Sequence, residues 1–462
     1  MTNSRSTRRK RNYMKINKDK NLLKEKIPAA SNSKIINNID NDDDGVDKIS
    51  QLPDDILVSI ISRLTVAEAV CTSVLSTRWR GLHMYITRLD FSPTSKQLQA
   101  FKDQEEERGR NKKGEDRVFE EQVVRNCASI IDRTLDSLKG GAALEEIQLY
   151  LPWFQINTWS DETTWPIGRW LDFAFSKKVV RTIHLHLNSV HASARFPIPP
   201  CNFERNLPAF KSLKELSLQG VDFDDEGLRL LLLNSVALER LSISRNDALS
   251  DVRISGDLAP KLKHLSISTC WSIKTMEIRD MTNLESMRFH EFPHYCLRVI
   301  ENVPRLVELD TNCVEIGTEI LSRGNIISEQ LAKVKHVELE CHLYRNTCSF
   351  HDLVRFIDAC PCLQRLEIKF TSTNFHEEYY HMKVVNKASN DDHPQTVKLS
   401  GLEASPNELD LGVLVVGKAT ALEELIVKIS SDKSYTSRER TIARVRKEFQ
   451  PILQDSVNFV VV

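Results

Sequence analysis

The sequence predicts an α/β protein, in which three short helices precede an irregular solenoid of stacked parallel strands, with helices or loops on its convex side. Two patterns predict this fold. Apolar residues at helical spacing, with capping residues between them, fill positions 47–91. From residue 144 onward, an apolar-x-x-apolar-x-apolar pattern recurs along the chain. The composition is that of an ordinary globular protein, with 41% hydrophobic and 27% charged residues among 462.

The composition also excludes several classes of protein. Lys and Arg number 63 and Asp and Glu number 64, so the whole chain is not built around nucleic acid or a membrane surface. No apolar run approaches the roughly 18 residues of a membrane span. The N-terminus is charged and lacks the apolar segment of a signal peptide. We therefore expect the ten cysteines to lie in a reducing compartment, the nucleus or the cytoplasm or both.

Residues 1–46 read as a disordered tail that is first basic and then acidic. Its Lys, Arg, Asn and Ser residues cannot bury enough apolar surface to offset the entropy of ordering. The run Arg8–Arg11 fits a nuclear-import patch, and it fits a solvated basic tail equally well. An acidic run at residues 42–44 separates this tail from the first folded segment.

Residues 47–91 read as the three-helix bundle. Pro53 suits the start of the first helix, where its missing N–H costs nothing. Thr65 and Glu68 have the spacing of a capping box for the second helix. Ser76 is placed to cap a third helix that carries Trp79. A core of this size is small, so such a bundle usually needs a partner or a neighbouring domain.

Two runs in this bundle, 49–64 and 69–80, resemble the two halves of an F-box, the second half in its plant form. The resemblance implies that the bundle docks a Skp-type adaptor. By the same resemblance, the adaptor contacts fall on Leu52, Pro53, Ile56, Leu57, Ile60, Leu64, Val70, Val74, Leu75 and Trp79. Some of these residues must form the core of the bundle instead, and the sequence does not divide them. The run Thr65–Glu68 departs from the usual turn of the family, which puts the strength of adaptor binding in doubt.

Residues 92–117 are polar and charged and read as a flexible linker, and an amphipathic helix is expected over 118–138. The repeats then run to residue 370, with starts roughly 22–36 residues apart, as in leucine-rich repeats. The first, fourth and sixth residues of each pattern are expected to point into the core, as for Leu238, Leu241 and Ile243. Asn246 and Cys270 hold the ninth place of two aligned repeats, where a small polar group can bond the turn after the strand.

The alternate strand residues are expected to line the concave face of a curved sheet. Their mixed charge suits a protein partner better than a polyanion. For any one of them, we favour the interpretation of an ordinary solvated strand position. The candidate target-binding residues on this face are Arg240, His264, Arg288, His290, Glu308, His336, Glu338 and Arg365.

The C-terminal part departs from the repeat pattern. Residues 371–396 read as a polar loop, and residues 397–462 resemble the FBD region that ends many plant F-box proteins with leucine-rich repeats. This segment would also cap the solenoid. The order of the parts is similar to that of the F-box/FBD/LRR family.

No linear motif for catalysis, metal binding or cofactor binding occurs in the chain. The densest Cys and His zone, around Cys360 and Cys362, lacks the spacing that closes a tetrahedral zinc site. We therefore expect no catalytic residue, no cofactor and no metal, and we expect that the chain is not an enzyme. An enzyme built on the His-rich strands would need a deep pocket with converging titratable groups.

The family resemblance implies a substrate-recognition subunit of an SCF-type E3 ubiquitin ligase. The F-box would bind the Skp-type adaptor and, through it, the cullin, while the repeats would bind an unknown target protein. Nucleic acid and membrane are not expected partners. The alternative is a non-catalytic scaffold of leucine-rich repeats that does not assemble into a ligase.

Overall fold

The computed structural model of the chain describes residues 48–92, 128–129, 131–136, 144–151, 169–170, 172–173, 180–187, 196–197, 210–290, 296–312, 331–341, 350–371, 394–430 and 435–462. The chain divides into two compact units, residues 1–51 and 52–462, and the second is described below. The tail with Arg8–Arg11, most of the charged linker and most of the polar loop lie outside the described residues.

The helical module begins with α2 (Asp54–Ile61), which follows Pro53 as expected. Helix α3 (Val66–Cys71) begins at the predicted capping box, in which Thr65 and Glu68 each accept a hydrogen bond from the backbone N–H of the other. The third helix is not the one the sequence predicts. Two 3-10 turns, η1 (Thr72–Val74) and η2 (Leu82–Tyr85), replace it, and η2 follows Gly81 rather than a Ser76 cap. Gly81 has a φ of 102°, which interrupts a regular helix.

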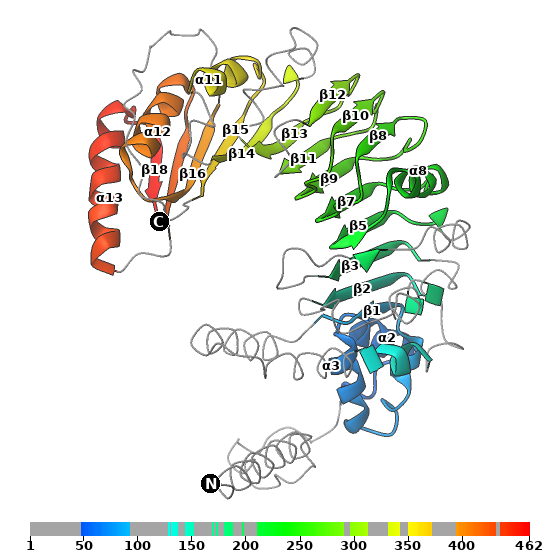
Figure 1. Cartoon of the computed structure of the whole chain (residues 1–462). Coiled ribbons are helices and arrows are strands. Elements are labelled where there is room, and N and C mark those ends of the chain that lie inside the picture. Colours follow the sequence, from blue (N-terminus) through cyan, green and yellow to red (C-terminus); the bar gives the residue numbers. More distant parts are fainter. Residues whose placement is uncertain are drawn as a thin grey trace, which may run out of the picture. The chain divides into compact units, whose positions relative to one another are not determined.

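The core of the fold is one parallel sheet of thirteen strands, and Figure 1 shows the labelled strands in succession. A parallel ladder of this length has the strand order of a leucine-rich-repeat solenoid, as the sequence predicts. In order, the strands are β1 (Arg88–Asp90), β2 (Glu146–Leu151), β3 (Thr182–Leu187), β5 (Glu215–Gln219), β7 (Arg240–Ser244), β9 (His264–Ser268), β11 (Ser286–His290), β13 (Glu308–Asn312), β14 (His336–Cys341), β15 (Arg365–Phe370), β16 (Thr396–Leu402), β17 (Glu424–Ile429) and β18 (Asn458–Val461).

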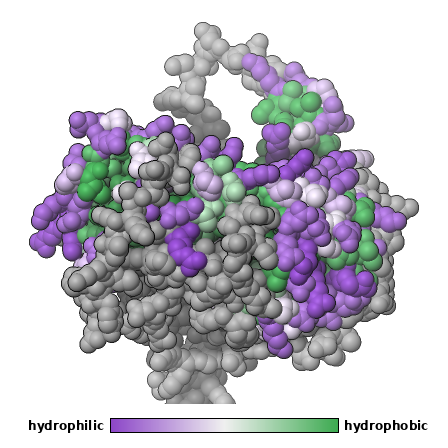
Figure 2. All heavy atoms as spheres, turned by 90° about the horizontal axis from the view of Figure 1, so that it is seen from above, coloured by the Kyte–Doolittle hydropathy of each residue, from purple (hydrophilic) through white to green (hydrophobic). Residues whose placement is uncertain are grey.

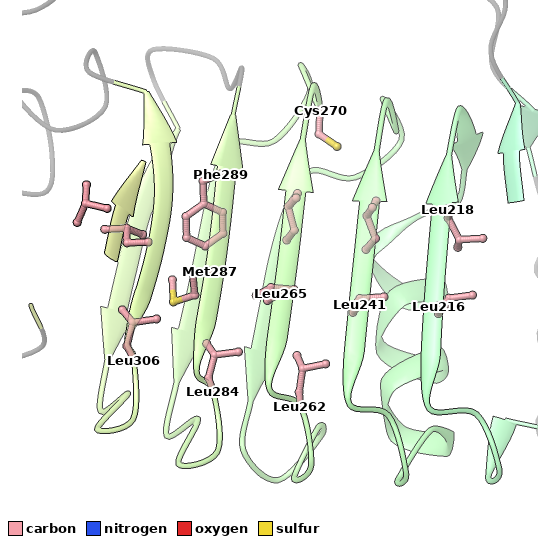
Figure 3. Packing of buried hydrophobic residues seen from close by; sticks show 14 of the residues in the cluster. Leu216, Leu218, Leu241, Leu262, Leu265, Cys270, Leu284, Met287, Phe289 and Leu306 are labelled. Carbon is pink, nitrogen blue, oxygen red and sulfur yellow. The ribbon is translucent and has the colours of Figure 1, made fainter. Parts of the chain in front are cut away.

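The apolar positions of the repeat pattern are buried, as predicted. Leu216, Leu241, Leu265 and Met287 occupy matching register positions on four successive strands, and Figure 3 shows their side chains in one row. A single repeat could not shield such a row from water, whereas stacked neighbours can. The looser repeat near residue 306 places buried Thr311 at its sixth position, so a polar residue enters the core there.

The segments that connect the middle repeats form strands, where the sequence predicts helices or loops. Strands β8 (Asp251–Ser255), β10 (Thr275–Arg279) and β12 (Leu297–Glu301) form a second parallel sheet, and β4 (Phe196–Pro197) pairs with β6 (Val221–Asp222). Val252 and Ile254 alternate with polar residues, and both are buried. Alternation over five residues favours a strand over a helix. Helices α8 (Asp225–Asn234) and α11 (Phe350–Asp358) occupy two other connections.

The sheet continues through the segment that resembles the FBD region. Strands β16, β17 and β18 extend the same parallel ladder. They alternate with α12 (Pro406–Lys418), α13 (Tyr435–Phe449) and η6 (Gln450–Ile452), and the buried Phe449 anchors α13. Figure 1 shows α12 and α13 next to these strands. Among the described helices, none has the length and apolar character needed to cross a membrane.

Candidate functional site

The first candidate surface lies on the helical module, where α2 has two apolar faces. Leu57 and Ile61, four residues apart, point inward and are fully buried. Ile56 and Ile60, with the same spacing one position earlier, are exposed. Residues four apart share one face of a helix, so the burial of one pair leaves the other pair on the surface. The helix is therefore apolar on more of its circumference than its own core requires.

More exposed apolar side chains follow in α3 and η1. Val70 is 47% exposed, Val74 is 85% exposed and Leu75 is exposed as well. Together with Ile56 and Ile60 they are called the apolar surface of the helical module below. Single exposed apolar residues are common in soluble proteins, but five within about twenty residues of one small module are a candidate docking surface.

The structure divides the ten predicted adaptor contacts into three groups. Leu57 and Trp79 are buried in the core of the module. Leu52 and Leu64 are half-buried and pack against that core. The exposed group consists of Pro53, Ile56, Ile60, Val70, Val74 and Leu75.

A side-chain contact joins the two halves of the helical module. The Arg78 guanidinium donates hydrogen bonds to Asp54 Oδ1 from Nη2 at 2.7 Å and from Nε at 3.1 Å. Asp54 lies in the first turn of α2, where a carboxylate also interacts favourably with the helix dipole. Both side chains are exposed, so the contact orients them but contributes little free energy.

The second candidate surface is the face of the large sheet formed by the alternate, non-core residues of β2 to β15, called the polar face below. All eight predicted target-binding residues lie on it, because each alternates with a buried neighbour. Parallel register aligns Arg240 with His264, and it aligns Glu308 with His336 and Arg365. This alignment shows which residues are neighbours, and a binding role for them stays a prediction.

Five of the eight residues meet around one hollow. It has a volume of about 280 Å³ and lies over β11, β13, β14 and β15. Arg240 and His264 lie on strands outside the hollow, and His290 does not line it. The predicted residues in its lining are Arg288, Glu308, His336, Glu338 and Arg365, and Asp310 and Glu367 complete its charged groups.

Ion pairs connect the charged side chains around the hollow. His290 Nε2 lies 2.6 Å from Asp310 Oδ1, and His290 Nδ1 lies 3.4 Å from Glu340 Oε2. Burial lowers the pKa of His290, but the two carboxylates raise it more, to about 9. For Asp310, burial raises the pKa, but the hydrogen bonds and charges of His290 and Arg288 lower it by more, so the net shift is downward. The imidazole is therefore charged at neutral pH.

The sequence reasoning missed a cluster at the other end of the polar face. His184 and His186 on β3 stack with ring centroids 6.0 Å apart, and Tyr150 on β2 meets His186 edge-on at 6.1 Å. Burial and the neighbouring His184 lower the pKa of His186. On β3, the buried residues Ile183 and Leu185 alternate with polar residues. The same alternation that predicts the other strands would therefore have identified His184 and His186.

The described residues hold no group of three or more His, Cys, Asp or Glu side chains arranged for a metal ion. Cys360 is buried, and burial raises the pKa of its thiol to about 12, which keeps it protonated. Cys341 is disulfide-bonded. Disulfides are rare in the reducing compartment that the sequence predicts for the cysteines.

Two family models match parts of the chain. The F-box domain model matches residues 49–82, which contain α2, α3 and η1 and end at the first residue of η2. The model "At1g61320/AtMIF1, LRR domain" matches residues 195–316, the middle of the large sheet. The chain therefore has an F-box followed by a domain of leucine-rich repeats.

Its relatives include proteins of Arabidopsis thaliana. F-box/FBD/LRR-repeat protein At4g26340 is 26% identical over 306 residues, which cover 62% of this chain and 65% of the relative. F-box/LRR-repeat protein At3g26922 is 28% identical over 62% of this chain and 85% of its own length. F-box/LRR-repeat protein At1g55660 is 49% identical over 47 residues, 10% of this chain and 13% of the relative.

These relatives make the chain a homologue of the F-box/FBD/LRR-repeat proteins. The match spans just under two thirds of the first relative, at 65%. The short match with the third relative has the highest identity of the three, although it covers only 47 residues.

Proposed function

We propose that this chain is the substrate-recognition subunit of an SCF-type E3 ubiquitin ligase. In this proposal, the apolar surface of the helical module docks a Skp-type adaptor, which links the chain to a cullin. The polar face of the repeats binds the target protein. The chain itself contributes no covalent chemistry.

The observation that carries the proposal is the set of exposed apolar side chains on a module that matches the F-box. Val74, at 85% exposed, has almost no contact with its own chain. Burying such side chains against a partner gains roughly 25 cal/mol per Å² of apolar area removed from water. Leu57 and Ile61 lie in the core of the module, and the residues of the apolar surface do not. The exposed apolar side chains therefore serve no folding purpose.

The proposed mechanism is proximity. A target held on the polar face would be tethered near an activated ubiquitin, which raises the effective concentration of its lysines. Such a mechanism requires two separate surfaces on one chain. The apolar surface of the helical module and the polar face lie on different elements, which supports the proposal. No converging catalytic group is needed.

The test is binding of a purified Skp-type adaptor to the full chain. Val70→Asp places a charge on the apolar surface of the helical module and should weaken binding by about tenfold or more. Val236→Asp is the matched control, because Val236 lies outside the module and is 49% exposed, against 47% for Val70. Val74→Asp repeats the test at a position outside the α-helices. Isothermal titration calorimetry measures the affinities.

Two results would contradict the proposal. Undiminished binding by both Val70→Asp and Val74→Asp would exclude the apolar surface as the docking site. A wild-type chain that does not bind the adaptor would favour the alternative, a scaffold of leucine-rich repeats without ligase assembly. In that case, the capping box at Thr65 should be exchanged for the usual turn of the family, and adaptor binding should be measured again.

A further inference from the structure

The hollow on the polar face has the size of a site for one side chain. Its volume of about 280 Å³ lies just below the range of about 300–1,000 Å³ that is usual for drug-sized ligands and cofactors. It lies between neighbouring strands of the sheet, so an extended segment laid across these strands could insert one long side chain. The charges that line the hollow then decide which side chain fits.

Three carboxylates occupy adjacent register positions in the floor of the hollow. Asp310 is directly opposite Glu338, and Glu338 is directly opposite Glu367. Like charges directly opposite each other on neighbouring strands destabilise a sheet. The three carboxylates therefore depend on nearby cations, with which each of them forms an ion pair.

Three of the cations that pair with these carboxylates lie outside the lining of the hollow. Lys398 Nζ lies 2.6 Å from Glu367 Oε1, and Lys369 pairs with Glu338. His290 pairs with Asp310 at 2.6 Å. None of these three cations is among the lining residues, so the carboxylates border the cavity while Lys398, Lys369 and His290 lie outside it.

The remaining charged groups of the lining are more exposed. Glu308 is 54% exposed, and His336 Nδ1 lies 3.8 Å from its Oε1. Arg288 is already bound to Asp310, and Arg365 lies 3.6 Å from Glu367. Leaving His336 aside, the lining presents the four carboxylates of Glu308, Asp310, Glu338 and Glu367 against two arginines.

Resting on the function proposed above, we propose that this hollow recognises a lysine or arginine side chain on an extended segment of the target protein. The neighbouring strands favour such an approach. Ser217, Ser242 and Ser266 lie in one register row that continues to Arg288. Their short side chains let the backbone of a bound segment come close to the sheet beside the hollow.

The test uses three fluorescent nine-residue peptides of Gly and Ser that carry three Arg, three Gln or three Glu residues at alternate positions. Fluorescence anisotropy measures their binding to the full chain at low salt, where screening is weakest. Glu308→Gln and Glu338→Gln each remove one negative charge of the lining. Glu424→Gln is the matched control, because Glu424 lies on β17 of the same sheet, outside the hollow.

The Arg peptide should bind the wild-type chain more tightly than the Gln peptide, and the Glu peptide should bind most weakly. Glu308→Gln and Glu338→Gln should each weaken the Arg peptide by about threefold to fivefold, whereas Glu424→Gln should not. Arg365→Gln should leave binding unchanged or strengthen it. Glu308 is exposed, so its variant keeps the test valid if Glu338→Gln disturbs the sheet.

The inference is overturned if the Glu peptide binds as well as the Arg peptide, or if Glu308→Gln binds the Arg peptide like the wild type. Adaptor binding by the same variants separates this result from a failure of the proposed function. A chain that selects the Arg peptide but never binds the adaptor would refute the ligase role and keep the basic-side-chain site. A chain that binds the adaptor but does not select the Arg peptide would refute the basic-side-chain site and keep the ligase role.

Discussion

His290 on β11 and Asp310 on β13 form an ion pair across neighbouring strands of the polar face, with 2.6 Å between Nε2 and Oδ1. Both side chains are largely buried, and Asp310 Oδ2 also accepts a hydrogen bond from Arg288 Nε. Glu340 faces the other nitrogen of the imidazole. A buried charged histidine of this kind is stable only while its carboxylates are ionised.

The ion pair predicts a loss of stability at high pH. The pKa of His290 is raised to about 9 from an ordinary value of 6.5, so its contribution is fully present below 6.5 and disappears as the pH rises through about 9. His290→Gln should lower the free energy of unfolding by about 1–2 kcal/mol at neutral pH. Urea unfolding should show that this difference shrinks towards zero near pH 10. His264→Gln is the control, and a difference that persists at pH 10 would contradict the assignment.

Asn246 predicts a large local effect. Its buried amide donates to the carbonyl of Phe223 at 3.1 Å and accepts from the N–H groups of Ala248 at 2.9 Å and Leu249 at 3.1 Å. Asn246→Ala removes these three hydrogen bonds in a buried site and should cost about 3 kcal/mol in chemical denaturation. Asn283→Ala removes an exposed bond to the carbonyl of Pro260 and should cost less than about 1 kcal/mol. Equal losses would contradict the structural role of Asn246.

Two glycines of α12 predict opposite effects of the same substitution. A Cβ at Gly412 would lie 2.6 Å from Phe449 Cζ and 3.0 Å from Leu399 Cδ1, whereas a Cβ at Gly417 would meet nothing within 4 Å. Gly417→Ala should raise the melting temperature, because alanine favours a helix by about 1 kcal/mol. Gly412→Ala should lower it by separating α12 from α13 and β16. Thermal unfolding followed by circular dichroism distinguishes the two, and a stabilised Gly412→Ala would contradict this packing.

The turn after β9 predicts a stabilising substitution. Thr269 has a φ of 56°, a left-handed conformation that is unfavourable for a β-branched residue. Thr269→Gly should therefore raise the free energy of unfolding by about 0.5–1 kcal/mol, net of the greater freedom of glycine in the unfolded chain. The control, Thr182→Gly within β3, should lower it. Differential scanning fluorimetry gives the sign, and a destabilised Thr269→Gly would show that the hydroxyl group matters more than the backbone.

The sequence predicts the inward-facing residues of the large sheet well, because period-two alternation and stacking make the same demand in every repeat. Leu241 and Leu265 are therefore buried as expected. Strands β8, β10 and β12 were not predicted, since stretches such as Val252–Ile254 are too short to stand out between stronger repeats. The third helix was wrong because Gly81 interrupts it.

The candidate site is predictable only in part. Alternation places Glu308 and Glu338 on one face, but the hollow between them depends on the pairing of strands that are 28 residues apart in register. On α2, Ile56 and Leu57 have the same apolar character in the sequence. Burial separates them, because it depends on how the helix packs against the rest of the module.

Strand β1 belongs both to the end of the helical module and to the large sheet. Backbone hydrogen bonds join Thr87 to Glu145 and Glu146, and Phe91 to Gln148. The first repeat strand, β2, is thus hydrogen-bonded directly to the residues that follow η2, so the two parts are joined by more than the linker between them. In the proposed ligase, the repeat that binds the target would then set the distance between a target lysine and the helical module. This distance would determine whether ubiquitin can reach the lysine.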